Sequence, residues 1–282
     1  MNTELFFRDP APDTPVMPFD EPLIMDSHGS RIFGRLLRPA FYDETSTAPV
    51  VLMLHGHPGG DRNLDIAAYL RANGLAVAYF SYRGIWGSQG DYCLSHNIED
   101  VATVTAYIRE HAAQYRVDPN RFYLFGHSMG GFSALNAMAA GLTVSGAILL
   151  APCDTGYKYL HAPKEFTSLM ACKASGYFHL PAEDYLETDA AQHAEEWYFP
   201  HLAERLDASI PYRFIGGARD VTTPPRQHIL PLLERLQALG RDVRYTELDD
   251  GHMFPVSRVR LARLALSLLS EMEAHNTNAT KG

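Results

Sequence analysis

Residues 122–141 read FYLFGHSMGGFSALNAMAAG. The first four residues are bulky and apolar, as in a buried strand, and residues 132–140 favour a helix that Gly141 ends. Between them, Gly126-His127-Ser128-Met129-Gly130 fits the pattern G-x-S-x-G at a sharp strand-to-helix turn. Such a turn holds its serine in a strained backbone conformation at the C-terminal edge of a sheet. Ser128 is therefore a candidate nucleophile, although the pattern alone also occurs in glycine-rich turns without a function.

Further buried strands and helices alternate on both sides of this turn. Continuous apolar runs, typical of strands buried on both faces of a parallel sheet, predict strands at 50–54, 75–80, 122–125, 144–150, 212–215 and 243–248. Helical patterns predict helices at 63–73, 97–114 (with Asn97 as its N-cap), 226–239 (with a kink at Pro231) and 256–275. A hairpin is expected over 21–38, and a turn at 118–120. The fold class is therefore α/β, with a mostly parallel, doubly wound sheet.

The alternation is interrupted after the strand at 144–150. Residues 152–210 contain no strong strand, several prolines and many aromatic residues. An insertion of this length between a strand and a helix is usually functional. We expect a helical cap over residues 152–210, and a core formed by residues 1–151 and 211–282.

Composition and charge narrow the class of protein. The 282 residues carry a net charge of −9, with 24 Lys and Arg against 33 Asp and Glu and no basic stripe. Nucleic acid and membrane are therefore not expected partners. The three cysteines form no disulfide framework, and the first residues lack the pattern of a secretory signal. We expect a soluble cytoplasmic protein with a small-molecule substrate, and formation of a homo-oligomer stays open.

Two further residues follow the ends of predicted strands. A serine hydroxyl needs a general base, and that base needs an orienting acid. Behind a G-x-S-x-G turn the expected chain order is serine, acid, histidine. Asp220 follows the strand at 212–215, and His252 follows the strand at 243–248. We predict that His252 accepts the Ser128 proton and that Asp220 orients the imidazole.

An alternative acid remains. Asp154 follows the strand at 144–150 and could also reach the histidine. Asp249 and Asp250 are too close to His252 in the chain and are expected to shape its turn. His127 is next to the nucleophile, but neighbours on a sharp turn point apart, so we interpret it as structural.

Attack on a carbonyl also creates an oxyanion that needs N–H donors. One expected donor is the backbone N–H of Met129, at the N-terminus of the helix. The other should come from the loop His55-Gly56-His57-Pro58-Gly59-Gly60. Pro58 has no N–H, which leaves His57 or Gly59, and we favour His57.

Cofactor chemistry is not expected. The glycine-rich loop at 55–60 lacks the lysine and the spacing of a phosphate-binding loop. His55 and His57 have no third ligand at a suitable spacing, and the cysteines are isolated. We therefore predict neither a metal nor another cofactor.

Taken together, these motifs resemble the α/β-hydrolase superfamily over nearly the whole chain. The similarity rests on His55-Gly56-x-Pro58-Gly59-Gly60, Tyr82-Arg83-Gly84, the Ser128 turn and the loops of Asp220 and His252. The residues 82–91 and the Ser128 turn are most similar to small feruloyl or cinnamoyl esterases and to the catalytic domains of prolyl oligopeptidases and dienelactone hydrolases. Dienelactone hydrolases usually carry cysteine at the turn, and the chain has no room for the propeller of a prolyl oligopeptidase.

The resemblance implies an α/β-hydrolase fold and a serine esterase that works through an acyl-enzyme. The aromatic cap suggests apolar or aromatic substrates, with Trp86, Tyr157 and Trp197 as candidate pocket residues, although most such rings pack cores. The same groups could serve an amidase, an aminopeptidase or an acyltransferase. An acidic cluster in the cap (Glu183, Asp184, Glu187, Glu195 and Glu196) would favour an aminopeptidase but is more typical of a solvated face. A non-catalytic receptor of this fold is a further alternative.

Overall fold

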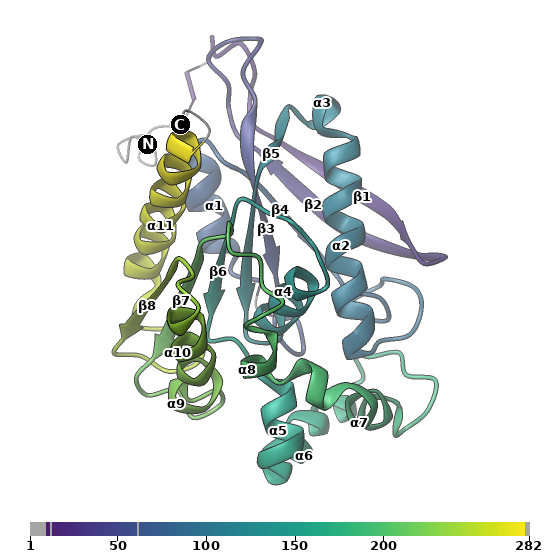
Figure 1. The fold of residues 1–282 in the computed structure, drawn as a ribbon. Coiled ribbons are helices and arrows are strands. Elements are labelled where there is room, and N and C mark those ends of the chain that lie inside the picture. Colours follow the sequence, from purple (N-terminus) through teal and green to yellow (C-terminus); the bar gives the residue numbers. More distant parts are fainter. Residues whose placement is uncertain (1–9, 12, 61, 280–282) are drawn as a thin grey trace.

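The computed structural model describes residues 10–11, 13–60 and 62–279 and is built around an eight-stranded sheet (Figure 1). The strand order is β1-β2-β4-β3-β5-β6-β7-β8. The strands are β1 (Phe19–Ser27), β2 (Ser30–Arg38), β3 (Ala48–Leu54), β4 (Ala76–Phe80), β5 (Val117–His127), β6 (Gly146–Leu150), β7 (Tyr212–Gly217) and β8 (Val243–Leu248). The pairs β1–β2 and β2–β4 are antiparallel, and the remaining neighbours are parallel. The predicted fold class is confirmed.

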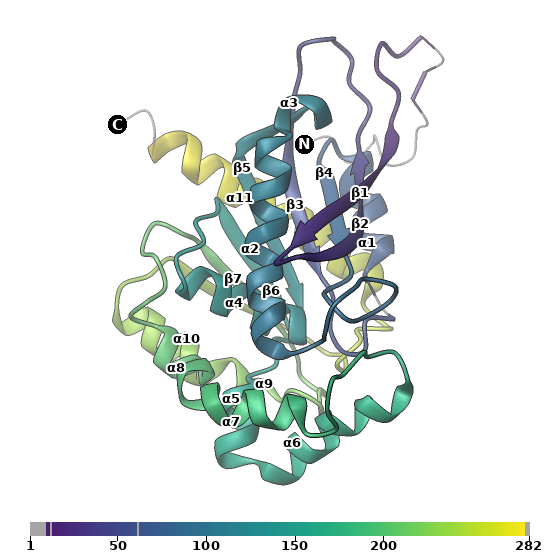
Figure 2. The same cartoon turned by 90° about the vertical axis from the view of Figure 1, so that its right-hand side faces the viewer.

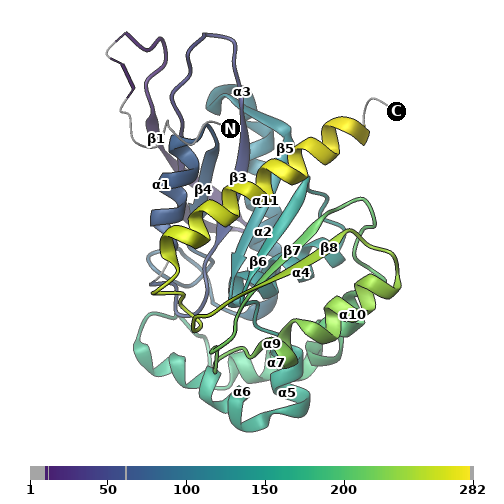
Figure 3. The same ribbon diagram turned by 90° about the vertical axis from the view of Figure 1, so that its left-hand side faces the viewer.

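Helices cover both faces of the sheet, as Figures 2 and 3 show. One face packs against α1 (Leu64–Ala72) and α11 (Arg258–Ala279). The other packs against α2 (Leu94–Glu110), α4 (Met129–Ala139) and α10 (Leu230–Ala238). Two short helices, α3 (Ala112–Tyr115) and α9 (Pro225–His228), complete the core. All seven residues of β3 are buried, which explains why its sequence is continuously apolar rather than alternating.

Residues 152–210, which we call the cap segment, connect β6 to β7 through helices. These are α5 (Thr155–His161), α6 (Pro163–Met170), the 3-10 helix η2 (Ala171–Ser175), α7 (Tyr185–Trp197) and α8 (Phe199–Leu202). They lie beyond the C-terminal ends of the parallel strands (Figure 1). A backbone bridge joins Ile85 to Phe178, and the Tyr92 N–H donates to the His179 carbonyl at 2.9 Å. The cap segment is therefore attached to the loop that follows β4.

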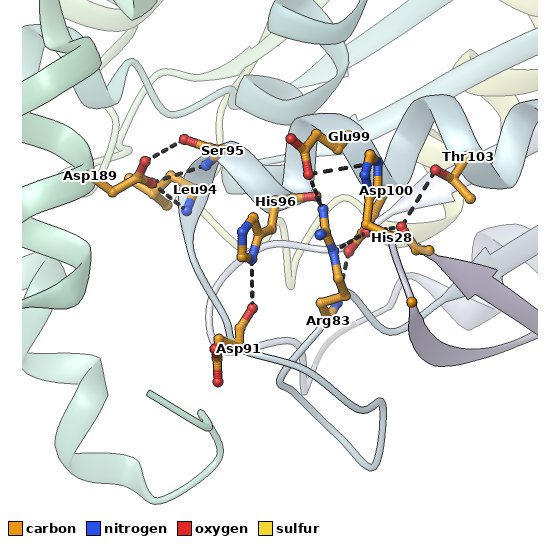
Figure 4. A network of polar contacts seen from close by, with 12 residues as sticks. His28, Arg83, Asp91, Leu94, Ser95, His96, Glu99, Asp100, Thr103 and Asp189 are labelled. Atoms are coloured by element: carbon orange, nitrogen blue, oxygen red, sulfur yellow. Dashed lines mark hydrogen bonds and ion pairs between the residues drawn. The ribbon is translucent and has the colours of Figure 1, made fainter. Parts of the chain in front are cut away.

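The start of α2 differs from the expectation. Asn97 was expected as its N-cap, but the helix begins at Leu94, and Asn97 lies inside it with a buried side chain. Asp189, from α7 of the cap segment, accepts hydrogen bonds from the backbone N–H groups of Leu94 and Ser95 at 2.9 and 3.0 Å (Figure 4). A carboxylate at a helix N-terminus satisfies free N–H groups and complements the helix dipole. The prediction for Asn97 was wrong because this cap comes from a distant part of the chain.

Two other boundaries differ. The expected turn at 118–120 is an irregular part of β5. The pairing with β3 shifts there, because Ala48 pairs with Val117 and Val50 pairs with Phe122. The expected helix at 226–239 is divided at Ile229 into α9 and α10. Pro231 stands in the first turn of α10, where its missing N–H costs no helical hydrogen bond. Among the described residues, no helix has both the length and the hydropathy to cross a membrane.

Candidate active site

Ser128 lies between β5 and α4 with a φ of 55° and a ψ of −117°, a strained conformation for a residue with a side chain. Small neighbours make this turn possible. A Cβ on Gly126 would lie 2.5 Å from the Gly130 carbonyl oxygen, and one on Gly130 would lie 2.0 Å from the Leu54 carbonyl oxygen. The glycines therefore allow α4 to start directly against β5 and β3, with Ser128 at its N-terminus.

Gly130→Ala is expected to lower the free energy of unfolding by about 3 kcal/mol, since the added methyl group meets backbone that cannot move alone. Chemical denaturation followed by circular dichroism measures the change. Gly60→Ala is the control, because nothing lies within 4 Å of a Cβ at Gly60. Equal stabilities of the two variants would contradict this account of the turn.

The structure brings the three residues predicted from the strand ends together. His252 Nε2 lies 3.0 Å from Ser128 Oγ, and His252 Nδ1 lies 2.8 Å from Asp220 Oδ2. The Ser128 hydroxyl can thus donate to Nε2 while the Nδ1–H of the same ring donates to Asp220. This arrangement lets the imidazole remove a proton from Ser128 and share the resulting positive charge with a carboxylate.

Asp220 is held as an anion by its surroundings. Its side chain is fully buried, and its Oδ1 accepts hydrogen bonds from the backbone N–H groups of Thr222 and Thr223 at 2.8 and 2.9 Å. Burial by itself raises the pKa of Asp220, but the hydrogen bond and charge of His252 and the hydrogen bonds of Thr223 lower that pKa to about 2. The acid therefore stays ionised over the pH range in which a histidine base works.

This lowered pKa predicts a pH-dependent contribution to stability. The folded-state pKa lies below the ordinary value of 3.8, so the stabilisation is present above about pH 4 and is lost as the pH falls toward 2. We expect the free energy of unfolding of wild type to exceed that of Asp220→Asn by about 2 kcal/mol at pH 6, with the difference narrowing below pH 4. Urea denaturation at several pH values measures it, and a difference that does not change with pH would contradict the assignment.

Asp154, the alternative acid, has a different position. Its Oδ1 accepts the Tyr157 N–H at 2.8 Å and its Oδ2 accepts the Phe199 N–H at 3.0 Å, so it caps both α5 and α8. Burial raises the pKa of Asp154 to about 8 against the effect of these hydrogen bonds. Both Asp154 oxygens accept hydrogen bonds from residues of the cap segment, whereas Asp220 accepts the hydrogen bond of His252.

The neighbours of the triad position the His252 loop. His127 Nε2 lies 3.0 Å from the His252 carbonyl oxygen, and Asn63 Nδ2 lies 3.4 Å from His127 Nδ1. Asp250 accepts the backbone N–H groups of Gly251, Val256 and Ser257, so it shapes the turn as expected. His127 thus contacts the loop that carries His252, a structural role whose target its place in the chain does not reveal.

The loop that is predicted to supply the second oxyanion donor lies against Ser128. A Cβ on Gly56 would lie 2.9 Å from Ser128 Cβ, so the loop at 55–60 passes directly over the serine. Among the described residues, neither the Met129 N–H nor the His57 N–H has a hydrogen-bond acceptor in the protein. Two free donors next to a nucleophile are what an oxyanion requires.

The ring of His57 is fixed on both sides. Asn97 Nδ2 donates to Tyr92 Oη at 2.9 Å, which directs the Tyr92 hydroxyl to His57 Nε2 at 2.6 Å. His57 Nδ1 then carries the proton and faces Cys172 Sγ at 3.3 Å. Burial lowers the pKa of His57 to about 4, so the ring stays neutral at physiological pH. Asn97 therefore supports the loop at 55–60, which we call the oxyanion loop, and does not cap a helix.

The three aromatic candidates for the pocket have different environments. Trp86 is 40% exposed, donates from Nε1 to the Pro58 carbonyl oxygen at 2.7 Å and stacks on Tyr177. Tyr157 is partly buried against His228. Trp197 is 3% exposed and packs edge-on against Phe132, 5.1 Å between ring centroids, so it instead joins the cap segment to the core.

Two cavities adjoin these elements. One, of about 320 Å³, lies between the oxyanion loop, the Asp220 loop and the cap segment; its lining includes His57, Lys158, Glu165, Leu169 and Thr222. The other, of about 270 Å³, is an open hollow beside Trp86 and Tyr177. The first cavity is large enough for a small ligand, and it borders the loop at 55–60 and the Asp220 loop. Within the described part of the chain, no cluster of three or more histidine, cysteine or acidic residues could hold a metal ion.

Comparisons with known proteins find a matching family and similar folds. Residues 45–233 match the model of the family described as Serine aminopeptidase, S33. The quorum-quenching protein AidA of Acinetobacter baumannii is 29% identical over 164 residues, which cover 56% of this chain and 51% of that protein. The lysophosphatidylserine lipase ABHD12 of Danio rerio is 32% identical over 94 residues, which cover 32% of this chain and 23% of that protein. The matched region thus spans about half or less of these two relatives.

Solved structures show the same fold at low sequence identity. A puromycin hydrolase superposes with a TM-score of 0.70 at 21% identity, covering 94% of this chain and 41% of that one. Est1E from Butyrivibrio proteoclasticus superposes with a TM-score of 0.66 at 17% identity, covering 90% of this chain and 99% of that one.

Proposed function

Because the chain belongs to the α/β-hydrolase superfamily, in the serine aminopeptidase S33 family, and is a serine hydrolase, we propose that it cleaves carboxylic esters through an acyl-enzyme. Ser128 is the proposed nucleophile, His252 the general base and acid, and Asp220 the orienting acid. The observation that carries the proposal is the continuous contact from Asp220 through His252 to Ser128 at 2.8 and 3.0 Å.

In the proposed mechanism, Ser128 Oγ attacks the ester carbonyl carbon while its proton passes to His252 Nε2. The carbonyl oxygen becomes an oxyanion that accepts hydrogen bonds from the Met129 and His57 N–H groups. When the tetrahedral intermediate collapses, the carbon–oxygen bond to the alcohol breaks and Nε2 returns the proton to the leaving oxygen. Water then repeats the sequence on the acyl-enzyme, releasing the acid and restoring Ser128.

The dimensions of the site favour small substrates. The cavity of about 320 Å³ is bounded by both catalytic loops, and Pro58, Leu169 and Val221 give it apolar walls. His57, Val221 and Thr222 line this cavity, so a substrate group seated there would lie beside the loop of the proposed oxyanion donor and the Asp220 loop. We propose that the substrates are small apolar or aromatic esters and that the reaction uses no cofactor. We also propose that residues 152–210 form a cap over the site. From the composition of the chain we further propose that the protein is cytoplasmic and binds neither nucleic acid nor membrane.

Hydrolysis of amides by the same groups is the second candidate. The matching family is described as a serine aminopeptidase, and similar folds occur in a puromycin hydrolase and in peptidases. The triad geometry serves both reactions, since an amide needs the same attack and the same protonation of its leaving group.

One set of assays separates the two candidates. We expect turnover of p-nitrophenyl esters, with the largest kcat/KM for acyl chains that fit the cavity, and a kcat/KM at least about a hundredfold lower for aminoacyl anilides. Faster turnover of the anilides would favour the aminopeptidase. Turnover of neither class, with a folded protein, would favour a receptor without catalysis.

A further inference from the structure

Lys158 is an unusual residue of the cap segment, because its ammonium group is buried next to the catalytic loops. Its side chain is 5% exposed, and it lies on α5 rather than in the core sheet. A buried ammonium is costly unless acceptors surround it. Lys158 Nζ has two such acceptors: Glu165 Oε2 at 3.0 Å, within the cap segment, and the Thr222 carbonyl oxygen at 2.8 Å, in the Asp220 loop.

The second acceptor connects Lys158 to the triad. The Thr222 carbonyl and the Thr223 N–H belong to one planar peptide group. The oxygen of this group accepts from Lys158 at 2.8 Å, and its N–H donates to Asp220 Oδ1 at 2.9 Å. A cation at the oxygen polarises the peptide and strengthens the hydrogen bond that its N–H donates. Lys158, this peptide, Asp220, His252 and Ser128 thus form an unbroken chain of contacts.

We propose that Lys158 is a positioning residue of the active site, which holds the Asp220 carboxylate in line with His252 through the Thr222–Thr223 peptide. The inference rests on the proposed triad but not on the choice between esters and amides. The cap segment then contributes to catalysis through Lys158, in addition to covering the site. Val221 is 90% exposed, whereas Thr223 is fully buried and its hydroxyl donates to Asp220 Oδ2 at 2.9 Å, so Lys158 restrains the carboxylate together with Thr223.

The segment contains a matched control. Lys173, on η2, has the same two kinds of partner, the Glu183 carbonyl oxygen at 2.6 Å and Glu187 Oε1 at 2.5 Å. Both of those partners belong to the cap segment, and neither belongs to a catalytic loop. The Lys173 side chain is more exposed, 20% against 5% for Lys158, and Lys173→Met removes its ammonium without touching the Asp220 loop.

The test measures the rate at which a fluorophosphonate reacts with Ser128, which needs an aligned triad and no knowledge of the natural substrate. We expect Lys158→Met to slow this reaction by about tenfold, the effect of a charge-assisted hydrogen bond. Lys158→Arg should recover most of the rate, since a guanidinium can also donate to a carbonyl. Lys173→Met should react as wild type does. Thermal denaturation confirms that each variant is folded; should Lys158→Met not fold, Lys158→Leu, which also lacks a donor, replaces it.

A double-mutant cycle distinguishes positioning from general destabilisation. If Lys158 acts through Asp220, Lys158→Met should slow the reaction by less than about twofold in an Asp220→Asn background. Equal slowing in both backgrounds, or a wild-type rate for Lys158→Met, would overturn the proposal and leave the triad intact. A wild-type protein that does not react at all would overturn both the triad and the role of Lys158.

Discussion

Ser128→Ala is expected to reduce kcat for p-nitrophenyl ester hydrolysis by about a millionfold, because no other group can form the acyl-enzyme. The residual rate would come from the oxyanion donors and from substrate binding alone. KM should change little, since the hydroxyl is small and the cavity walls stay in place. Initial rates at saturating ester, with enough enzyme to detect the residual activity, measure the effect.

Ser270→Ala is the matched control for this variant. Its hydroxyl donates to the Leu266 carbonyl inside α11, away from the catalytic edge, so kcat should stay within about twofold of wild type. If Ser128→Ala kept a hundredth or more of the wild-type kcat, Ser128 would not be the nucleophile.

Asp220→Asn has the second largest expected effect, a fall in kcat of about ten-thousandfold. An asparagine in this position can donate to His252 Nδ1, which favours the tautomer with its proton on Nε2. That nitrogen then cannot accept the Ser128 proton. The variant also loses the negative charge that stabilises the imidazolium formed during attack.

Asp154→Asn is the control, and it also tests the alternative acid. The Asp154 side chain caps α5 and α8, so its replacement should lower stability while kcat stays within about threefold of wild type. Thermal denaturation and initial rates on the same samples provide both measurements. A larger loss of kcat for Asp154→Asn than for Asp220→Asn would reverse the assignment.

The features that were predictable from the sequence are those set by local chemistry and by topology. The strand, turn and helix around Ser128 follow from neighbouring residues, because the close approach of β5 and α4 excludes side chains at Gly126 and Gly130. Asp220 and His252 could be located because parallel strands end at one edge of a sheet. The first argument needs only neighbouring residues, and the second needs only the order of elements along the chain.

The unpredicted features depend on pairs that are distant in the chain. Asp189 caps α2 across 95 residues, and Lys158 reaches Thr222 across 64. No periodicity or spacing reveals such contacts. The expected Asn97 cap failed for the same reason, since the N–H groups at the start of α2 donate to Asp189 instead. Thr223 is a partial exception: an aspartate followed by threonines two and three positions later is typical of a turn in which the carboxylate accepts backbone N–H groups.

The central claim is that Ser128, activated by His252 and Asp220, is the nucleophile. Its most direct test is mass spectrometry of peptides from the folded protein after reaction with a fluorophosphonate. We predict one phosphonyl group per chain, located on Ser128, and none on Ser128→Ala treated in the same way. An unlabelled wild-type protein, or an adduct on any other residue, would contradict the account.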